Sequence, residues 1–76
     1  MMTLYSKPNC VYCDKVKSFI KANNITNVAF DESANVAKVQ SMGGMQFPML
    51  LIKNDDGSEQ GIFESEVIMQ VISQMQ

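Results

Sequence analysis

Residues that could carry out redox chemistry stand near the start of this 76-residue chain, where Cys10 and Cys13 are the only two cysteines. They follow a strand-like segment and precede an amphipathic one, so the pair is expected at the beginning of a helix. The first turn of a helix presents unpaired N–H groups and about half a positive charge, and both favour a thiolate over a thiol. A thiol of ordinary pKa, about 8.5, is only a few per cent ionised at neutral pH. A thiol whose pKa is lowered to roughly 3.5–7.5 is present largely as the thiolate, which is the nucleophile. The pattern therefore predicts dithiol–disulfide exchange.

The two thiols are expected to play different parts. Cys10 lies at the helix start, where backbone N–H groups and the nearby Lys7 favour its anion, while Cys13 lies one turn further in and deeper. Attack by Cys10 on a substrate disulfide forms a mixed disulfide, which Cys13 then displaces to close the Cys10–Cys13 bond. Tethering removes the entropic cost of finding a second thiol. We therefore assign Cys10 as the nucleophile and Cys13 as the resolving thiol.

Length and composition indicate a single domain spanning residues 1–76 and exclude several function classes. A formal net charge of −2 and the absence of arginine argue against a nucleic-acid binder, which normally carries a basic face. No apolar run is long enough to cross a bilayer, so no membrane partner is expected. With two cysteines and no histidine, one chain cannot supply the four ligands of a closed zinc site. We expect a monomer with no bound metal or cofactor.

The surroundings of the cysteines support two interpretations. The N-terminal segment lacks the features of a secretory signal, so the chain is expected in the cytoplasm, where a close cysteine pair is catalytic or metal-binding rather than structural. Four of the six lysines lie in the first 21 residues, which suggests that the thiol end is electropositive. The alternative is that Lys15, Lys17 and Lys21 only solvate the outer face of a helix.

The first half of the chain alternates between strand and helix patterns. Residues 3–5 alternate like a short strand, and residues 11–23 place apolar side chains three or four positions apart, as in an amphipathic helix. Residues 28–30 predict a second strand. A second helix is predicted over 34–42, ending at Gly43-Gly44 and capped by side chains from the preceding segment, Asp31, Glu32 and Ser33.

The second half predicts a hairpin and a final helix. Residues 49–52 form a continuous apolar run, as expected of a strand that is buried on both faces, and a turn at 54–57 returns residues 58–63 antiparallel to it. The last helix is predicted to begin at a capping Ser65 and to carry one apolar stripe, Val67, Ile68, Val71, Ile72 and Met75. The order βαβαββα predicts an α/β fold with a four-stranded mixed sheet flanked by helices. Its functional crevice is expected beyond the carboxyl end of the first strand, where the cysteines follow.

Residues 3–74 resemble the glutaredoxins, a family with the thioredoxin fold. The segment Tyr5-Ser6-Lys7-Pro8-Asn9-Cys10-Val11-Tyr12-Cys13 is similar to the family's strand, lysine-bearing loop and Cys-Pro-Tyr-Cys centre, with Val11 in place of the usual proline. Phe47-Pro48 matches the place where the family carries a cis-proline opposite the thiols. Gly61-Ile62-Phe63-Glu64-Ser65 resembles the glycine-containing turn before its last helix.

The resemblance implies a thiol–disulfide oxidoreductase that reduces protein disulfides, glutathione mixed disulfides or both. A cis Pro48 would leave the backbone N–H and C=O of Phe47 free to pair with an extended substrate or with glutathione. Tyr12 would shape the groove beside Cys10; as an ordinary half-exposed aromatic it would do nothing. The residues that the resemblance gives to substrate or glutathione are Lys7, Tyr12, Phe47, Pro48, Glu64 and Ser65.

Electron donor, acceptor and a second function stay open in the sequence. Glutathione or thioredoxin reductase would supply the electrons, and ribonucleotide reductase is a candidate acceptor beside other disulfide-containing proteins. The alternative function is glutathione-assisted binding of an iron–sulfur cluster between two subunits. Met42, Met45 and Met49 bracket the Phe47-Pro48 segment, and we interpret them as core residues rather than as an adaptable surface for protein partners.

Overall fold

Strands and helices follow one another in the order that the sequence predicts. The computed structural model describes residues 1–75. The elements are β1 (Met2–Tyr5), α1 (Val11–Ala22), β2 (Val28–Asp31), α2 (Val36–Ser41), β3 (Met49–Lys53), β4 (Glu59–Phe63) and α3 (Ser65–Gln74). The predicted order βαβαββα is therefore confirmed.

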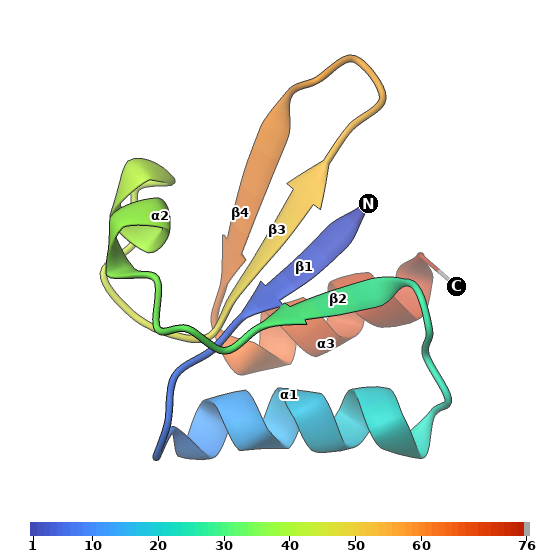
Figure 1. The fold of residues 1–76 in the computed structure, drawn as a ribbon. Helices are drawn as coiled ribbons and strands as arrows, with labels where there is room; N and C mark the ends of the chain where they lie inside the picture. The colour runs from blue at the N-terminus through green and yellow to red at the C-terminus, as the bar shows by residue number, and fades with distance from the viewer. Residues whose placement is uncertain (76) are drawn as a thin grey trace.

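The four strands form one mixed sheet in the order β2-β1-β3-β4 (Figure 1). β1 and β2 are joined through α1 and run parallel, with Leu4 opposite Phe30. β3 is antiparallel to both of its neighbours, and Leu50 lies opposite Leu4 on one side and Ile62 on the other. Both faces of β3 are covered, since Leu50 and Ile52 pack with α1 and α3 and Met49 and Leu51 pack with Val39 of α2, and this explains its uninterrupted apolar sequence.

Helices cover the two faces of the sheet unequally. α1 and α3 lie side by side beneath one face, whereas the six-residue α2 lies on the other side (Figure 1). The main core fills the space between the sheet, α1 and α3, and its fully buried members include Leu4, Val16, Ile20, Leu50, Ile68 and Ile72. Alternate residues of β3, Met49 and Leu51, point the other way and pack with Val39 of α2 in a second, smaller core. This packing fixes α1, and the cysteines at its start, against the centre of the sheet.

Helix α2 is shorter than predicted and is capped by a different residue. The side chain of Asn35 accepts a hydrogen bond from the Lys38 N–H over 3.1 Å, so the helix begins at Val36 instead of residue 34. Asp31, expected among the caps, instead accepts from the N–H and hydroxyl of Ser33. Because the Asp31 side chain bonds to Ser33, two residues ahead, it forms a local turn. This turn competes with capping of α2, whose N-cap lies four residues after Asp31. The predicted stop is confirmed, since Gly43 adopts a φ of +86° after the helix.

Helix α3 has a different cap and a different buried line from those predicted. Its N-cap is Glu64, without a side-chain capping hydrogen bond, and Ser65 is the first helical residue and is buried. The buried line runs from Ser65 through Ile68 to Ile72, with steps of three and four. Val67 and Met75, assigned to the apolar stripe, are exposed. Val67 is turned by about 100° from Ile68 and points away from the buried line, and Met75 is the C-cap residue at the end of the helix.

Within residues 1–75, no helix combines the length and the apolar character that crossing a bilayer requires.

Candidate functional site

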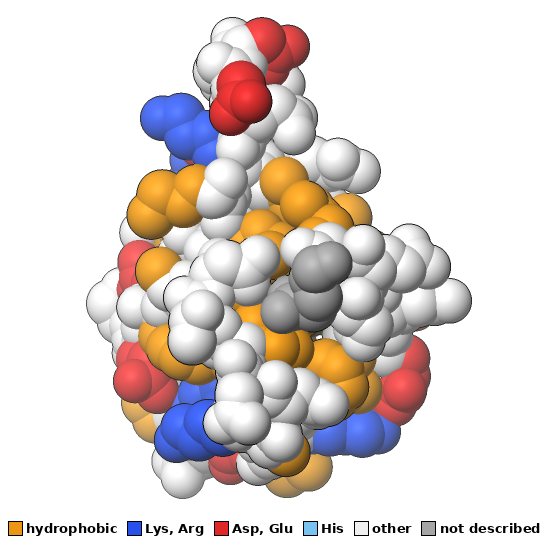
Figure 2. Space-filling model, turned by 90° about the vertical axis from the view of Figure 1, so that its right-hand side faces the viewer, with side chains coloured by type: hydrophobic (Ala, Val, Ile, Leu, Met, Phe, Trp, Pro, Cys, Tyr) orange, Lys and Arg blue, Asp and Glu red, His pale blue; other side chains and the backbone are white. Residues whose placement is uncertain are grey.

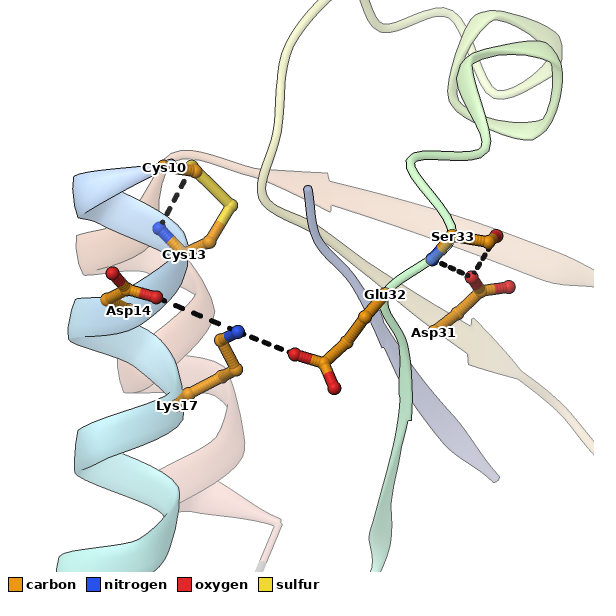
Figure 3. Close-up of polar contacts among 7 residues, drawn as sticks. All are labelled: Cys10, Cys13, Asp14, Lys17, Asp31, Glu32 and Ser33. Atoms are coloured by element: carbon orange, nitrogen blue, oxygen red, sulfur yellow. Dashed lines mark hydrogen bonds and ion pairs between the residues drawn. A yellow bond between two sulfur atoms is a disulfide. The ribbon is translucent and has the colours of Figure 1, made fainter. Parts of the chain in front are cut away.

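The two cysteines form a disulfide at the N-terminus of α1 (Figure 3). Their Cα atoms are 5.2 Å apart. Cys10 is the N-cap residue, with extended backbone angles (φ −114°, ψ 108°), and its sulfur accepts a hydrogen bond from the Cys13 N–H over 3.2 Å. The Cys10 carbonyl accepts from the Asp14 N–H over 3.0 Å and closes the first helical turn. Cys10 thus occupies the position that sequence reasoning assigned to the nucleophile, at the positive end of the helix.

The two sulfur-bearing residues differ in exposure. Cys10 retains 8% of its surface accessible to solvent, and Cys13 retains none. Because attack on a disulfide requires access to one of its sulfurs, an incoming thiol reaches the pair from the side of Cys10. Cys13 is the more deeply buried of the two cysteines, as the sequence predicts.

The loop between β1 and α1 turns the chain sharply just before Cys10. Asn9 adopts a φ of +57°, a conformation that asparagine tolerates better than most residues. Pro8 precedes it in the turn, and the loop starts directly after β1. The turn formers seen in the sequence therefore place the cysteines at the carboxyl end of β1, as the topology predicts.

A groove of about 200 Å³ opens at the start of α1, and neither cysteine is among its lining residues. It is lined by Tyr12 of α1, by Gln46, Phe47 and Pro48 of the loop before β3, and by Glu64 and Ser65 at the start of α3. The peptide bond between Phe47 and Pro48 is cis, as the resemblance implied. Five of the six residues that the resemblance gave to substrate or glutathione are thereby brought together.

Lys7 and Gln46 differ from expectation. Lys7 does not line the groove; its ammonium lies 5.9 Å from the centre of the Phe47 ring, a distance suited to a cation–π contact. Gln46 lines the groove and was missed. Its position directly before Phe47-Pro48 is the one signal that could have pointed to it.

The start of α3 contributes the groove's charge. Glu64 is exposed and adopts φ +72° and ψ 121°, a region that non-glycine residues rarely occupy. Its carbonyl accepts the Ile68 N–H, while its carboxylate makes no capping bond to the helix. Among the groove residues Tyr12, Gln46, Phe47, Pro48, Glu64 and Ser65, the glutamate is the charged one, so the wall at α3 is acidic.

Acidic side chains neutralise part of the lysine cluster near the cysteines. Lys17 bonds to Glu32 over 2.7 Å and lies 3.7 Å from Asp14 (Figure 3). The hydrogen bond with Glu32 raises the pKa of Lys17, and the same bond lowers the pKa of Glu32. Lys15 pairs with Glu66 of α3 over 2.5 Å, and this hydrogen bond raises its pKa. The thiol end is therefore less electropositive than the lysine distribution alone suggests.

A second depression, of about 250 Å³, lies between α1 and β2, and its lining does not include the cis-proline segment. Its charged lining includes the paired Lys17 and Glu32, beside the half-exposed ring of Phe30. Among residues 1–75, His, Cys, Asp and Glu side chains do not gather in threes that could hold a metal ion.

Solved structures share this fold. A glutathione S-transferase from Methylobacillus flagellatus KT, crystallised with GSH bound, is similar to 100% of this chain with a TM-score of 0.68 and 22% identity. This chain spans 37% of the length of that protein. The thioredoxin-like protein BC3987 matches 93% of this chain and 99% of its own, with a TM-score of 0.61 and 24% identity. A point mutant of BC3987 gives a TM-score of 0.62 at 23% identity over 95% of this chain and 99% of its own. The fold is therefore thioredoxin-like.

The sequence itself carries a family signature. None of the curated proteins matches the chain. A sequence model of the family described as Glutaredoxin matches residues 2–56, which include β1, both cysteines and the cis-proline segment. Since that match covers more than half of the chain and coincides with the cysteine pair and the thioredoxin-like fold, the chain belongs to the glutaredoxin family.

Proposed function

We propose that this protein is a dithiol–disulfide oxidoreductase that reduces protein disulfides and glutathione mixed disulfides through Cys10 and Cys13. The observation that carries the proposal is the sulfur of Cys10 at the N-cap of α1, where it accepts a hydrogen bond from the Cys13 N–H. A donor that already faces the sulfur also stabilises negative charge on it, and the helix dipole acts in the same direction.

The reaction runs in two exchanges. In the reduced protein the Cys10 thiolate attacks one sulfur of the substrate disulfide; a bond forms between the two sulfurs, and the other substrate sulfur leaves with the electron pair as a thiolate. The Cys13 thiol then loses its proton and attacks Cys10, which releases the second substrate thiol and leaves the Cys10–Cys13 disulfide. Two electrons and the Cys13 proton have passed to the substrate, and the thiolate released first takes a proton from water. An external thiol donor must return the pair to the dithiol form.

The groove supplies the binding surface in this proposal. Phe47 and Pro48 line the groove, and an extended substrate would pair with the backbone of Phe47 in the manner of an added strand. Tyr12 forms the opposite wall, and Glu64 with Ser65 would receive a substrate's cationic amino end. Glutathione is the co-substrate that the family suggests, and the ring of Phe47 with Lys7 above it would hold the carboxylate side.

The cysteine variants test the two roles. Cys10→Ser should abolish all exchange, because the one other thiol, that of Cys13, is fully buried. Cys13→Ser should stop the reduction of protein disulfides, which needs the second thiol, and should retain turnover of glutathione mixed disulfides, in which a free glutathione takes over the second step. Turnover of a protein disulfide by Cys10→Ser at the rate of the unchanged protein would overturn the assignment.

The electron donor is tested by a coupled assay. NADPH oxidation is followed with a small disulfide substrate, using either glutathione and its reductase or thioredoxin reductase as the source. We expect the glutathione arm to turn over, because glutathione is the co-substrate that the family suggests. Turnover only in the thioredoxin reductase arm would reassign the donor, and ribonucleotide reductase would then be the acceptor to test. Visible absorption by protein purified without oxygen, together with the absence of turnover, would favour a shared iron–sulfur cluster instead.

A further inference from the structure

One buried polar group takes no part in the contacts of the fold. Ser6 is fully buried, and its hydroxyl oxygen is the one buried side-chain nitrogen or oxygen within residues 1–75 that lacks a hydrogen-bond partner. Leaving a buried hydroxyl unpaired costs free energy, and such groups are rare in folded proteins. An alanine at this position would avoid that cost. The hydroxyl is therefore expected to find its partner in another state of the protein.

The backbone of Ser6 fixes the direction of this hydroxyl. The Ser6 N–H donates to the Asp31 carbonyl over 2.9 Å, which continues the pairing of β1 with β2, and its carbonyl accepts from the Ala34 N–H over 3.3 Å. Since side chains alternate between the two faces of a strand, Ser6 lies on the same face as Leu4. Leu4 belongs to the main core under α1 and α3, whereas Tyr5 packs against the smaller core on the other face. The Ser6 side chain therefore points to the α1 side of the sheet.

The buried line of α1 brings Cys13 to the level of Ser6. This line runs from Cys13 through Val16 to Ile20, and Val16 lies in the same core as Leu4. α1 runs back along β1 in the opposite direction, because it connects two parallel neighbouring strands. One step beyond Leu4 on this face of β1 is Ser6, and one step before Val16 on the buried line is Cys13. Figure 3 shows the disulfide on the side of α1 that is turned toward the strands.

The second exchange requires a hydrogen-bond donor at this level of the core. Cys13 has to lose its proton although it is closed off from solvent, and a thiolate in apolar surroundings is disfavoured. The Cys13 N–H already donates to the Cys10 sulfur. Lys15 and Lys17, on the same helix, are paired with carboxylates at the surface. The hydroxyl of Ser6, in contrast, is a donor that stands unused.

Resting on the proposed function, we propose that the Ser6 hydroxyl donates a hydrogen bond to the Cys13 sulfur once the disulfide is reduced, and that this bond assists the resolving step. Ser6 keeps its own proton; its O–H stabilises the negative charge that Cys13 carries before it attacks Cys10. The Cys13–Cys10 bond then forms, and the bond from Cys10 to the substrate breaks. The departing substrate sulfur takes the electron pair and the proton that Cys13 has lost. In the disulfide the Cys13 sulfur is neutral, which explains why the hydroxyl has no partner there.

A two-step colour reaction separates the resolving step from the first attack. The reduced protein is mixed with the symmetric disulfide of nitrothiobenzoate. The Cys10 thiolate bonds to one of its sulfurs and expels the first coloured anion with the electron pair, at a rate proportional to the reagent concentration. Cys13 then loses its proton to water and attacks Cys10, which expels the second anion at a rate independent of that concentration. Stopped-flow absorbance records both phases.

Ser6→Ala should slow the second phase about threefold and leave the first phase unchanged. Without the hydrogen bond the Cys13 thiolate becomes about tenfold scarcer, while the more basic thiolate that remains attacks about threefold faster. Ser6→Thr keeps a hydroxyl and should keep the rate of the unchanged protein. Thr3→Val removes a hydroxyl from the opposite face of β1, so this matched control should alter neither phase.

The stability of the oxidised protein shows whether Ser6→Ala still folds. Because the hydroxyl is unpaired in the disulfide form, oxidised Ser6→Ala should resist urea at least as well as the unchanged protein. A lower urea midpoint would mean that the hydroxyl already has a partner there, which would overturn the proposal.

The kinetic outcomes separate the role of Ser6 from the proposed function. An unchanged second phase in Ser6→Ala, or an equal loss in Ser6→Thr or Thr3→Val, would overturn the role of the hydroxyl while leaving exchange intact. If the unchanged protein releases colour no faster than free cysteine does, the exchange function itself is contradicted.

Discussion

The backbone N–H of Cys13 donates to the sulfur of Cys10 over 3.2 Å, so a cysteine fills the capping position that serine, threonine, asparagine or aspartate usually occupies. This hydrogen bond satisfies a donor at the start of α1. In the proposed mechanism the same donor would also stabilise the Cys10 thiolate after reduction.

The first prediction concerns the acidity of that sulfur. In the reduced protein, iodoacetamide should modify Cys10 rapidly at pH values where free cysteine, with its pKa of about 8.5, is protonated and slow. Because the folded state favours the Cys10 anion, this anion stabilises the fold at pH values above the pKa of the unfolded thiol. That stabilisation is lost as the pH falls through the folded pKa. The pH profile of alkylation, read by mass spectrometry, measures this. The same protein unfolded in urea is the control, and a folded profile that superposes on it would remove the basis of the mechanism.

The capping role is tested apart from the redox role. Cys10→Ser keeps a side-chain acceptor for the Cys13 N–H, whereas Cys10→Ala removes it, and neither variant can form the disulfide. We expect Cys10→Ala to unfold at lower urea concentration than Cys10→Ser, by about 1 kcal/mol in the free energy of unfolding. Equal stabilities would mean that the capping bond does not stabilise the helix.

The second prediction concerns α2, whose six residues form one turn and a half. Asn35→Ala removes the acceptor for the Lys38 N–H and should cost about 1 kcal/mol in the free energy of unfolding. Asn35→Asp keeps a good capping acceptor and should cost much less. Urea denaturation of the three proteins at equal pH measures both. A full loss in Asn35→Asp would show that the amide group, rather than the cap, is required.

Sequence patterns predicted the elements that depend on local periodicity. The helix of residues 11–23 and the strand at 49–52 were predicted because apolar residues recur with the right period or run without interruption. The place of Cys10 follows from the same pattern, since a thiol between a strand and a helix lies at the end of the strand and the start of the helix. The cis bond at Pro48 could be expected only from the family resemblance, because base rates favour trans.

Features that depend on tertiary contacts were missed or misjudged. Lys15 and Glu66 are 51 positions apart, and only the packing of α1 on α3 brings them together. Ser65 looks like a cap in the sequence, but the chain enters α3 through a positive φ at Glu64 one residue earlier. The exposure of Met45 follows from a loop without periodicity, where no pattern distinguishes a core methionine from a surface one.

The third prediction uses the close approach of the Gly44 backbone to the ring of Phe63, which no local pattern reveals. A Cβ at Gly44 would overlap the ring of Phe63, whereas a Cβ at Gly43 would meet open space but at a φ of +86°. Gly44→Ala should therefore cost about 1–3 kcal/mol in the free energy of unfolding through overpacking. The smaller side chain in Phe63→Leu should recover part of that loss in the double variant.

Gly43→Ala serves as the control for that cycle. Its loss comes from backbone conformation, so Phe63→Leu should not relieve it. Thermal or urea unfolding of the single and double variants gives the coupling energies. If Gly43→Ala and Gly44→Ala show the same coupling energy with Phe63→Leu, overlap with the Phe63 ring is not the cause of the stability lost in Gly44→Ala.

The fourth prediction concerns the ion pair of Lys17 and Glu32 beside the cysteines. The pair lowers the pKa of Glu32 from 4.5, so the stability it contributes is present above pH 4.5 and is lost as pH falls through the folded pKa. It raises the pKa of Lys17 above 10.5, so the contribution is also lost in strong alkali. Glu32→Gln should lower the urea midpoint at neutral pH and converge with the unchanged protein in acid. A constant difference at all pH values would exclude the ion pair as its source.

The last prediction separates backbone strain from function at Glu64. At φ +72° and ψ 121° a side chain is disfavoured, so Glu64→Gly should raise the free energy of unfolding by about 1 kcal/mol, whereas Glu64→Ala should not. Glu64→Gln keeps the backbone cost and removes only the charge on the groove wall. If the carboxylate receives the amino end of glutathione, all three variants should raise the KM for glutathione mixed disulfides several-fold with little change in the rate of Cys10 alkylation. An unchanged KM in Glu64→Gln, with increased stability in Glu64→Gly, would show that the glutamate carries the strain without binding the substrate.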